Sequence, residues 1–164
     1  MELVKANDAL IEKTSKFASE VFTDYYDDLI GHEQAAYMAK LFLSSEAIRK
    51  LMEEGAIFKL AIQDEKIIGF YEIKPEEDGR VFLSKLYAEK NHRHAGLGRV
   101  MFEDVKQFAK ENGYGKIYLT VNKYNTPSYE IYKHLGFKVI DSVVNDIGHG
   151  YVMDDYIMEY TIDE

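Results

Sequence analysis

A strand-like segment, a turn with two glycines and a helix-like segment follow one another in the middle of the chain, and this succession constrains the fold most. The pattern of residues 81–88 indicates a strand, and residues 99–112 place apolar side chains such as Met101 and Val105 at helical spacing. Residues 116–122 again suit a strand. The order predicts a β-α-β unit, which requires a sheet with a helix packed against it.

Away from this unit, the periodicity changes near position 56 from that of helices to that of strands. We expect helices between an N-cap at Asn7 and Gly31, and over residues 33–43, 45–55 and 126–135. We expect further strands over residues 57–63, 67–74, 137–144 and 151–161. No repeat, low-complexity tract or linker divides the chain. Residues 1–164 are therefore predicted to form one α/β domain, with a mixed, mostly antiparallel sheet of about six to seven strands flanked by helices.

The net charge and the composition limit the classes of molecule that this protein is expected to bind. The net charge is −9, from 20 basic and 29 acidic residues, which is the wrong sign for a protein that binds phosphate backbones. The same charge favours either steering of a cationic substrate or plain solubility. There are no cysteines, so disulfides, thiolate metal sites and cysteine nucleophiles are excluded. With no apolar run of membrane-spanning length, we expect a cytoplasmic protein that binds neither nucleic acid nor a membrane.

The turn between the central strand and helix has the features of an anion site. A helix start presents backbone N–H groups and partial positive charge, and glycine lets a phosphate approach the backbone closely. The candidate residues are Arg93, His94, Ala95, Gly96, Leu97, Gly98 and Arg99. The turn lacks the signatures of a P-loop and of a dinucleotide fingerprint, so a plain connection is the alternative. His92 and His94 lack an evident third ligand, and we expect no metal.

A second segment gives the turn a specific meaning. The first motif reads Arg93, Gly96 and Gly98, and the second, about thirty residues later, reads Asn125, Ser128, Ile131, Tyr132, Gly136 and Phe137. In this order and at this separation, the two resemble the acetyl-CoA motifs of the GCN5-related N-acetyltransferase (GNAT) family. The resemblance implies the GNAT fold, in which the sheet splays at its centre, and acetyl-CoA as the co-substrate.

The resemblance also implies roles for individual residues. Backbone groups of Leu86, Tyr87 and Ala88 would pair with the pantetheine arm as an added strand does. Amides from Arg93 to Arg99 would hold the pyrophosphate, and Asn125 and Ser128 would contact the cofactor from the other side. Tyr132 would be the general acid that protonates the departing thiolate. The alternative for Tyr132 is a core aromatic beside Tyr129.

The general base is less well marked. Polyamine acetyltransferases of this family often carry a glutamate at the position of Ser84. Glu72, on the preceding strand, is the substitute that we expect to lie near the splay. The alternatives are that Glu72 is a solvated outward carboxylate and that water relays the proton.

The acceptor side combines aromatic and acidic residues. Residues 22–28 and 151–156 are rich in both and could hold an ammonium, or could be only a helix end and an acidic hairpin edge. The closing segment resembles that of the PaiA-type spermidine/spermine acetyltransferases. We therefore expect direct acetyl transfer to a primary amine of a small molecule, with a polyamine as the lead. A non-catalytic acyl-CoA-binding module and a protein or peptide N-acetyltransferase are the alternatives, and the resemblance allows a homodimer.

Overall fold

The chain divides into two compact units. The computed structural model describes residues 1–92 and 96–162. The first unit holds Met1–Lys74 and Ser84–Val105, and the second holds Pro75–Leu83 and Lys106–Glu164. Among the described residues, seven strands have the order β1-β2-β3-β4-β5-β7-β6. The predicted mixed, mostly antiparallel sheet with flanking helices is confirmed.

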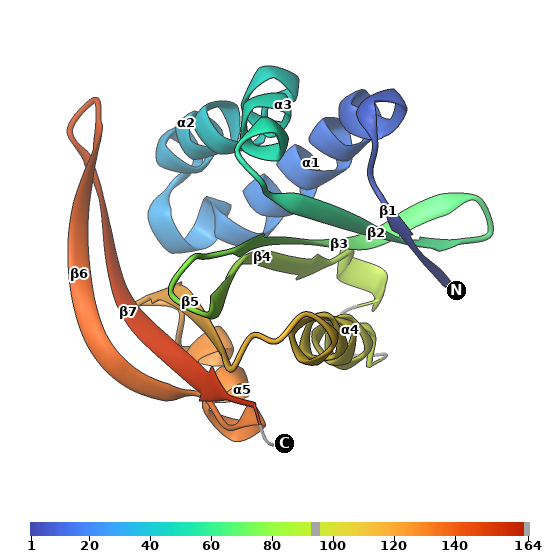
Figure 1. Ribbon diagram of the computed structural model, residues 1–164. Coiled ribbons are helices and arrows are strands. Elements are labelled where there is room, and N and C mark those ends of the chain that lie inside the picture. The colour runs from blue at the N-terminus through green and yellow to red at the C-terminus, as the bar shows by residue number, and fades with distance from the viewer. Residues whose placement is uncertain (93–95, 163–164) are drawn as a thin grey trace. The chain divides into compact units, whose positions relative to one another are not determined.

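The first unit packs helices on a sheet. Its strands are β1 (Glu2–Lys5), β2 (Ile57–Gln63), β3 (Lys66–Pro75) and the second half of β4 (Arg80–Ala88). Its helices are α1 (Ile11–Ile30), α2 (His32–Leu43), α3 (Ser45–Glu53) and the start of α4 (Leu97–Glu111), with short 3-10 turns at Asp8–Leu10 and Lys90–His92. Figure 1 shows α1, α2 and α3 over one face of these strands, with α4 beginning on the other face.

The N-terminal region contains one strand that was not predicted, and the expected helix cap at Asn7 is wrong. Residues 2–5 form a strand that pairs antiparallel with β2, from Glu2 opposite Ile62 to Lys5 opposite Lys59. Asn7 precedes a 3-10 turn and makes no side-chain capping bond. The third helix does begin as expected, because the Ser44 hydroxyl accepts a hydrogen bond from the Ala47 amide at 3.2 Å.

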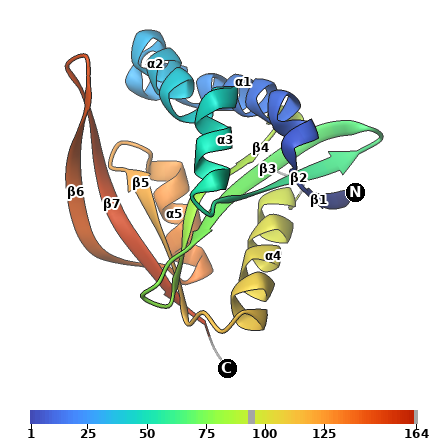
Figure 2. The same ribbon diagram turned by 45° about the horizontal axis from the view of Figure 1, so that its top comes forward.

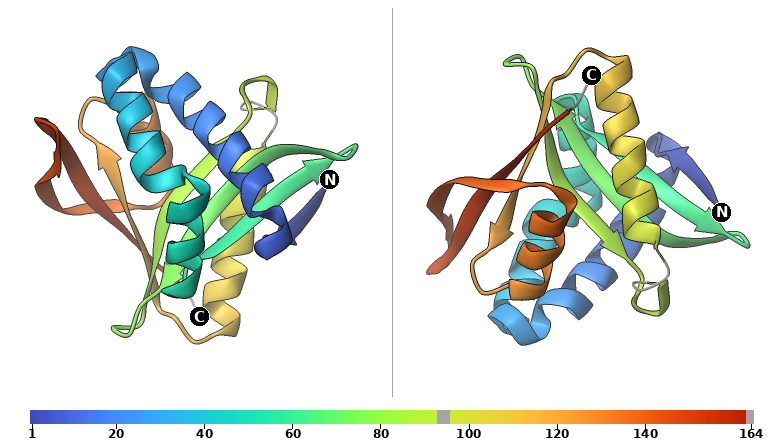
Figure 3. Two further views of the ribbon diagram at one scale, coloured as in Figure 1. Left: turned by 90° about the horizontal axis from the view of Figure 1, so that it is seen from above. Right: turned by 90° about the horizontal axis from the view of Figure 1, so that it is seen from below.

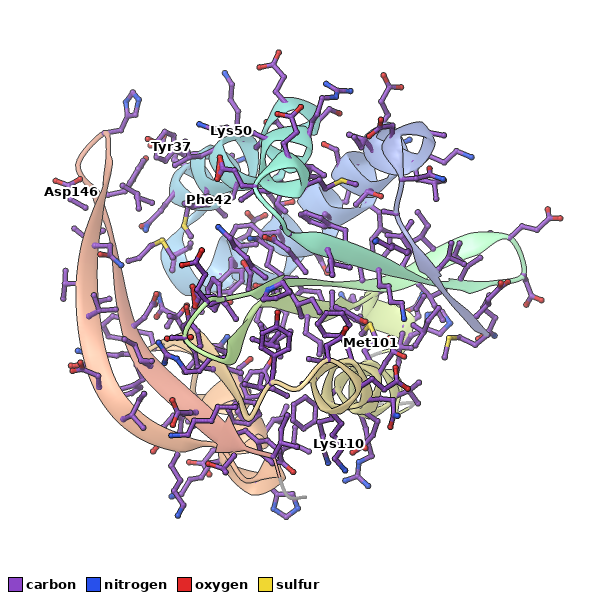
Figure 4. All side chains as sticks on the ribbon, in the orientation of Figure 1. Tyr37, Phe42, Lys50, Met101, Lys110 and Asp146 are labelled. Atoms are coloured by element: carbon purple, nitrogen blue, oxygen red, sulfur yellow. The ribbon has the colours of Figure 1, made fainter. Side chains whose placement is uncertain are left out.

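The core of the first unit lies on both faces of the β2–β3 hairpin. Asp64 and Glu65 have φ of 52° and 65°, the left-handed conformation that a two-residue hairpin turn requires. The hairpin buries apolar side chains fully, among them Phe58, Leu60, Phe70 and Ile73. Met101 of α4 is also fully buried and points toward the strands in Figure 4.

The second unit is built on antiparallel strands. β5 (Lys116–Asn122) pairs with β7 (Tyr151–Thr161), and β7 pairs with β6 (Lys138–Gly148), which runs four residues further than expected. Figure 2 shows β6 and β7 as one long hairpin, and α5 (Thr126–Leu135) lies beside it in the right-hand view of Figure 3. The first residues of β4, Arg80–Phe82, pair parallel with β5, which confirms the β-α-β unit. No described helix has the length and apolar character needed to cross a membrane.

Candidate active site

The predicted pyrophosphate turn joins β4 to α4 in the first unit. Arg93, His94 and Ala95 lie outside the described residues. Gly96 has φ of +82°, a conformation that favours glycine, and its carbonyl accepts the hydrogen bond of the Val100 amide at 3.1 Å. The amides of residues 97–99 therefore belong to the first turn of α4, where N–H groups have no acceptor within the helix. Leu97 is buried, whereas Arg99 is exposed.

Gly69 on β3, which no sequence motif marked, allows this turn to pack closely. A Cβ atom at position 69 would lie 3.0 Å from the Tyr87 carbonyl oxygen and 3.0 Å from a methyl group of Leu97. The Glu89 amide, just after β4, donates to the Ile68 carbonyl at 2.8 Å. Gly69 therefore brings the end of β4 and the head of α4 against the same point of β3.

An aromatic cluster surrounds the residues of β4 that are expected to meet the pantetheine arm. Leu86, Tyr87 and Ala88 are all half-buried. The Tyr87 hydroxyl donates to the Tyr26 hydroxyl at 3.3 Å, and the Tyr87 ring lies 5.8 Å from the ring of Tyr25. Tyr87 also contacts the rings of Phe22 and Phe70. The aromatic end of α1, singled out in the sequence, thus packs on the predicted cofactor strand.

Glu72 on β3 is buried rather than solvated. Its side chain is 4% exposed, and the Lys85 ammonium lies 3.1 Å from its carboxylate. The same ammonium donates to the Ser84 hydroxyl at 3.1 Å and lies 5.7 Å from the centre of the Phe42 ring. The solvated alternative for Glu72 is therefore wrong. Ser84, Glu72 and Lys85 form one polar cluster, in which Lys85 neutralises the carboxylate.

The second motif forms the start and the end of α5 in the second unit. The Asn125 side chain is buried and accepts a hydrogen bond from the Ser128 amide at 3.3 Å, so it caps the helix. Gly136 ends the helix with φ of +110°, and a Cβ atom there would lie 3.2 Å from the Tyr160 ring. The motif therefore defines both ends of α5, through the cap formed by Asn125 and Ser128 and the stop at Gly136. Tyr132 lies between these two helix ends.

Tyr132 is half-buried on α5. Its ring lies 5.5 Å from that of Phe137 in an edge-to-face arrangement, and Phe137 is buried against Tyr160. The Phe137 amide donates to the Tyr132 carbonyl at 3.0 Å. These contacts hold the ring of Tyr132 by one edge and its backbone at the helix end, which suits a phenol kept in a defined position.

The two neighbouring carboxyls on β7, Asp154 and Asp155, have different environments. The Asp154 carboxylate forms an ion pair with the Lys123 ammonium at 2.9 Å. Asp155 is 4% exposed, and burial raises the pKa of its carboxyl from 3.8 to about 6, with the Asp154 charge adding to the rise and Lys123 opposing it. The sequence marked this segment as acidic but gave no sign that only one of the two carboxyls is buried.

The histidine next to the turn forms a local contact. His92 Nδ1 lies 3.5 Å from the Glu89 carboxylate, three residues earlier. Within residues 1–92 and 96–162, no group of three or more acidic or histidine side chains is placed to hold a metal ion.

The β-α-β unit has a glycine turn at the start of α4 and is followed by a capped helix, α5, that carries Tyr132. Residues 13–137 match the model of the acetyltransferase (GNAT) family. Because this match covers more than half of the sequence, the chain belongs to the GNAT family.

Individual relatives share less than a third of their aligned residues with this chain. The chain is 29% identical over 93 residues to human N-acetyltransferase 8, covering 54% of this chain and 41% of that protein. It is 27% identical over 104 residues to the spermidine N(1)-acetyltransferase of Thermoplasma acidophilum, covering 63% of this chain and 64% of that protein. The chain thus spans less than two thirds of the length of each.

One solved structure is similar over almost its whole length. The PaiA N-acetyltransferase of Thermoplasma acidophilum, solved in complex with coenzyme A, aligns with a TM-score of 0.79 and 23% identity. The alignment covers 98% of this chain and 99% of that chain. At this identity the likeness establishes the GNAT fold.

Proposed function

We propose that this protein is an acetyl-CoA-dependent N-acetyltransferase that moves the acetyl group directly to a primary amine of a small molecule, with a polyamine as the leading acceptor. The observation that carries the proposal is the pairing of the two motifs with the GNAT family match. The two motifs supply a glycine turn at the start of α4 and a tyrosine on the capped helix α5.

Backbone groups and side chains would together form the donor half of the site. Main-chain groups of residues 86–88 would hold the pantetheine arm, and amides of residues 93–99 the pyrophosphate. Asn125 and Ser128 would add contacts from α5. The helix start supports this role by its dipole and by Gly96 and Gly98, which keep Cβ atoms away from the phosphate.

Tyr132 would supply the proton that the sulfur of coenzyme A needs when the carbon–sulfur bond breaks. A phenol keeps its proton at neutral pH and can donate it to a nascent thiolate within hydrogen-bond distance. Direct attack by the amine fits a chain without cysteine, which cannot form an acyl-cysteine intermediate.

The amine acceptor is supported by charge and by one relative. The chain carries a net charge of −9, which attracts cations. A spermidine N(1)-acetyltransferase is among its relatives at 27% identity. Glu72, the general base expected from the sequence, is one of two buried carboxyls that could take the proton of the amine, and Asp155 is the other. A non-catalytic acyl-CoA-binding module is the second candidate, because a shared fold does not fix activity.

A thiol-release assay with acetyl-CoA tests the activity. We expect turnover with spermidine or spermine, and weaker turnover with simple monoamines and peptides. Tight coenzyme A binding with no turnover on any amine would favour the non-catalytic alternative.

The role of Tyr132 has a matched control on the same helix. Tyr132→Phe should lower kcat about 100-fold or more, because general acid catalysis contributes about 10²–10⁴-fold. Coenzyme A affinity should stay close to that of the wild type. Tyr129→Phe, which keeps the ring that packs 5.5 Å from Tyr156, should leave kcat unchanged. Equal rates for the two variants would remove Tyr132 from the mechanism.

A further inference from the structure

Asp155 is a buried carboxyl in the middle of a three-stranded part of the sheet. On β5 its register partner is Asn122, and on β6 it is Val143. It is 4% exposed. Among the described residues, none donates a hydrogen bond to its carboxyl or forms an ion pair with it. Burying a carboxylate without a partner is costly, so the position is unusual for a purely structural residue.

Asp154 and Asp155 point to opposite faces of β7 and have different surroundings. Side chains alternate along a strand, so Asp154 and Tyr156 share one face and Asp155 points to the other. Tyr156 packs on Tyr129 of α5, which identifies its face as the α5 side of the sheet. On that side, Lys123 neutralises Asp154 at 2.9 Å. The Asp155 side chain therefore points away from α5, and its charge lacks the direct ion pair that Asp154 has.

The second cofactor motif begins three residues after Asn122, the register partner of this carboxyl on β5. Asn122, directly across from Asp155, is the last residue of β5, and Asn125 begins the cap of α5 three residues later. The Asn122 side-chain oxygen accepts from the Tyr124 amide at 2.9 Å, which fixes the connecting turn. The carboxyl thus sits at the strand end that leads into the helix of Tyr132.

We propose that Asp155 binds the ammonium group of the acceptor and takes its proton before the nitrogen attacks. This proposal rests on the proposed N-acetyltransferase activity and extends it to the acceptor half of the site. Primary ammonium is the chemical class that fits, because it supplies both the positive charge and the hydrogen-bond donors that the buried carboxylate lacks.

The proton and electron pairs balance in this scheme. The ammonium gives one proton to the Asp155 carboxylate, which later releases it to water, and the freed nitrogen pair forms the bond to the acetyl carbon. The carbon–sulfur bond then breaks with its electron pair on sulfur, and Tyr132 protonates that sulfur. The resulting phenolate recovers the second proton from the nitrogen. The products are the N-acetyl amine, free coenzyme A and one released proton.

The environment of Asp155 suits a base better than an ordinary aspartate does. Burial raises the pKa of its carboxyl to about 6, from 3.8. Each unit of pKa closer to that of the amine makes the proton transfer about tenfold less uphill. The charged groups that act on it are Asp154 on its own strand and Lys123 just after β5, while Asn122 and Val143 across from it are uncharged. Glu72, by contrast, already has Lys85 at 3.1 Å as its counter-ion.

The central experiment compares three isosteric variants of the full chain: Asp155→Asn, Glu72→Gln and Asp146→Asn. Asp146, an exposed residue of β6 near the tip of the β6–β7 hairpin in Figure 4, controls for the loss of one negative charge from the same hairpin. With the best amine found for the wild type, Asp155→Asn should lower kcat/KM about 100-fold or more. Asp146→Asn should remain close to wild type, and the coenzyme A affinity of all three should be retained.

A second readout separates proton removal from a structural role. Hydroxylamine is uncharged at neutral pH and needs no base before it attacks, so Asp155→Asn should lose far less activity on hydroxylamine than on an alkylamine. In the wild type, kcat/KM should fall as the pH drops through about 6, and Asp155→Asn should lack this acid limb.

Several outcomes would overturn the proposal. They are wild-type activity in Asp155→Asn, an equal loss on hydroxylamine and on the alkylamine, or a large loss in Glu72→Gln with Asp155→Asn intact. If the wild type turns over no amine while it binds coenzyme A, the proposed function itself fails, which is a distinguishable result.

Discussion

Gly69 on β3 and Gly98 in the first turn of α4 differ in the space around their α-carbons. A Cβ atom at Gly69 would lie 3.0 Å from a backbone oxygen, whereas at Gly98 the nearest atom is a Leu86 methyl at 3.8 Å. We expect Gly69→Ala to lower the free energy of unfolding by about 1–3 kcal/mol, because the backbone of Tyr87 must shift. Gly98→Ala should raise it by up to about 1 kcal/mol, because alanine favours the helix.

The same pair tests the proposed pyrophosphate contact. If phosphate approaches the amides at the start of α4, the methyl group of Gly98→Ala should weaken coenzyme A binding although the protein becomes more stable. Urea denaturation and a coenzyme A titration measure the two effects. A variant that is both stabilised and binds coenzyme A normally would argue against close approach at this residue.

Asp155 should make stability depend on pH in an unusual direction. Its carboxyl has a pKa of about 6 in the folded protein and of 3.8 as an ordinary aspartate in the unfolded chain, so between these two pH values the folded state binds more protons. The free energy of unfolding therefore falls as pH rises from about 4 to 6 and stays lower above that range. At about pH 8, Asp155→Asn should be more stable than the wild type by about 2–3 kcal/mol, and the difference should shrink toward about pH 4. Urea denaturation at both pH values measures it. A variant less stable than the wild type at about pH 8 would show that the carboxylate is compensated.

At the scale of elements, β3 and β4 are tied by the buried pair of Glu72 and Lys85, whose side chains are 4% and 12% exposed. Lys85→Met would leave the Glu72 carboxylate without its counter-ion, and we expect a loss of about 3–5 kcal/mol. The double variant Glu72→Leu with Lys85→Met should recover most of that loss, because no charge remains buried. A double-mutant cycle in urea gives the coupling between the two side chains. If the two losses simply add, the ion pair carries no net coupling.

The sequence predicted those helices and strands whose ends are marked by nearby capping, turn or stop residues. Asn125 and Gly136 delimit α5 because the first caps it by its side chain and the second ends it with a positive φ, and both effects act within a few residues. β1 was missed because residues 2–5 form a short strand, and its partner β2 follows more than fifty residues later. Short strands paired with distant segments have no such local mark.

In the candidate site, too, local sequence signals predicted some parts, whereas others depend on segments that are distant in the sequence. The glycine turn and the Asn125–Phe137 motif are contiguous, so the donor half could be predicted from residue spacing. The burial of Glu72 and its pairing with Lys85 depend on strands and a helix from separate parts of the chain. Asp155 is buried between β5 and β6, and no property of residues 151–156 alone separates it from Asp154. Acceptor chemistry of this kind is decided by packing, which the sequence does not display.

At the scale of the whole molecule, two elements belong to both units. β4 and α4 each begin in one unit and end in the other. A strand or helix cannot lose half of its length without weakening the rest, so we expect the chain to unfold in one cooperative transition. Matching midpoints from far-ultraviolet circular dichroism and tyrosine fluorescence would support this. Two separated midpoints would show that the units melt independently.

Binding of coenzyme A should stabilise the folded protein and shift this single unfolding transition to a higher temperature. A ligand at 100 times its Kd adds about 2.7 kcal/mol to the free energy of unfolding. For a chain of this size, that corresponds to a rise in Tm of about 5–10 °C. Since the proposed contacts come from the start of α4 and from α5, weakening either set should reduce the rise. Gly98→Ala and Asn125→Ala test the two sets, with Asp146→Asn as the control that keeps the full shift. A full rise in Asn125→Ala would show that the Asn125 side chain does not contact the coenzyme.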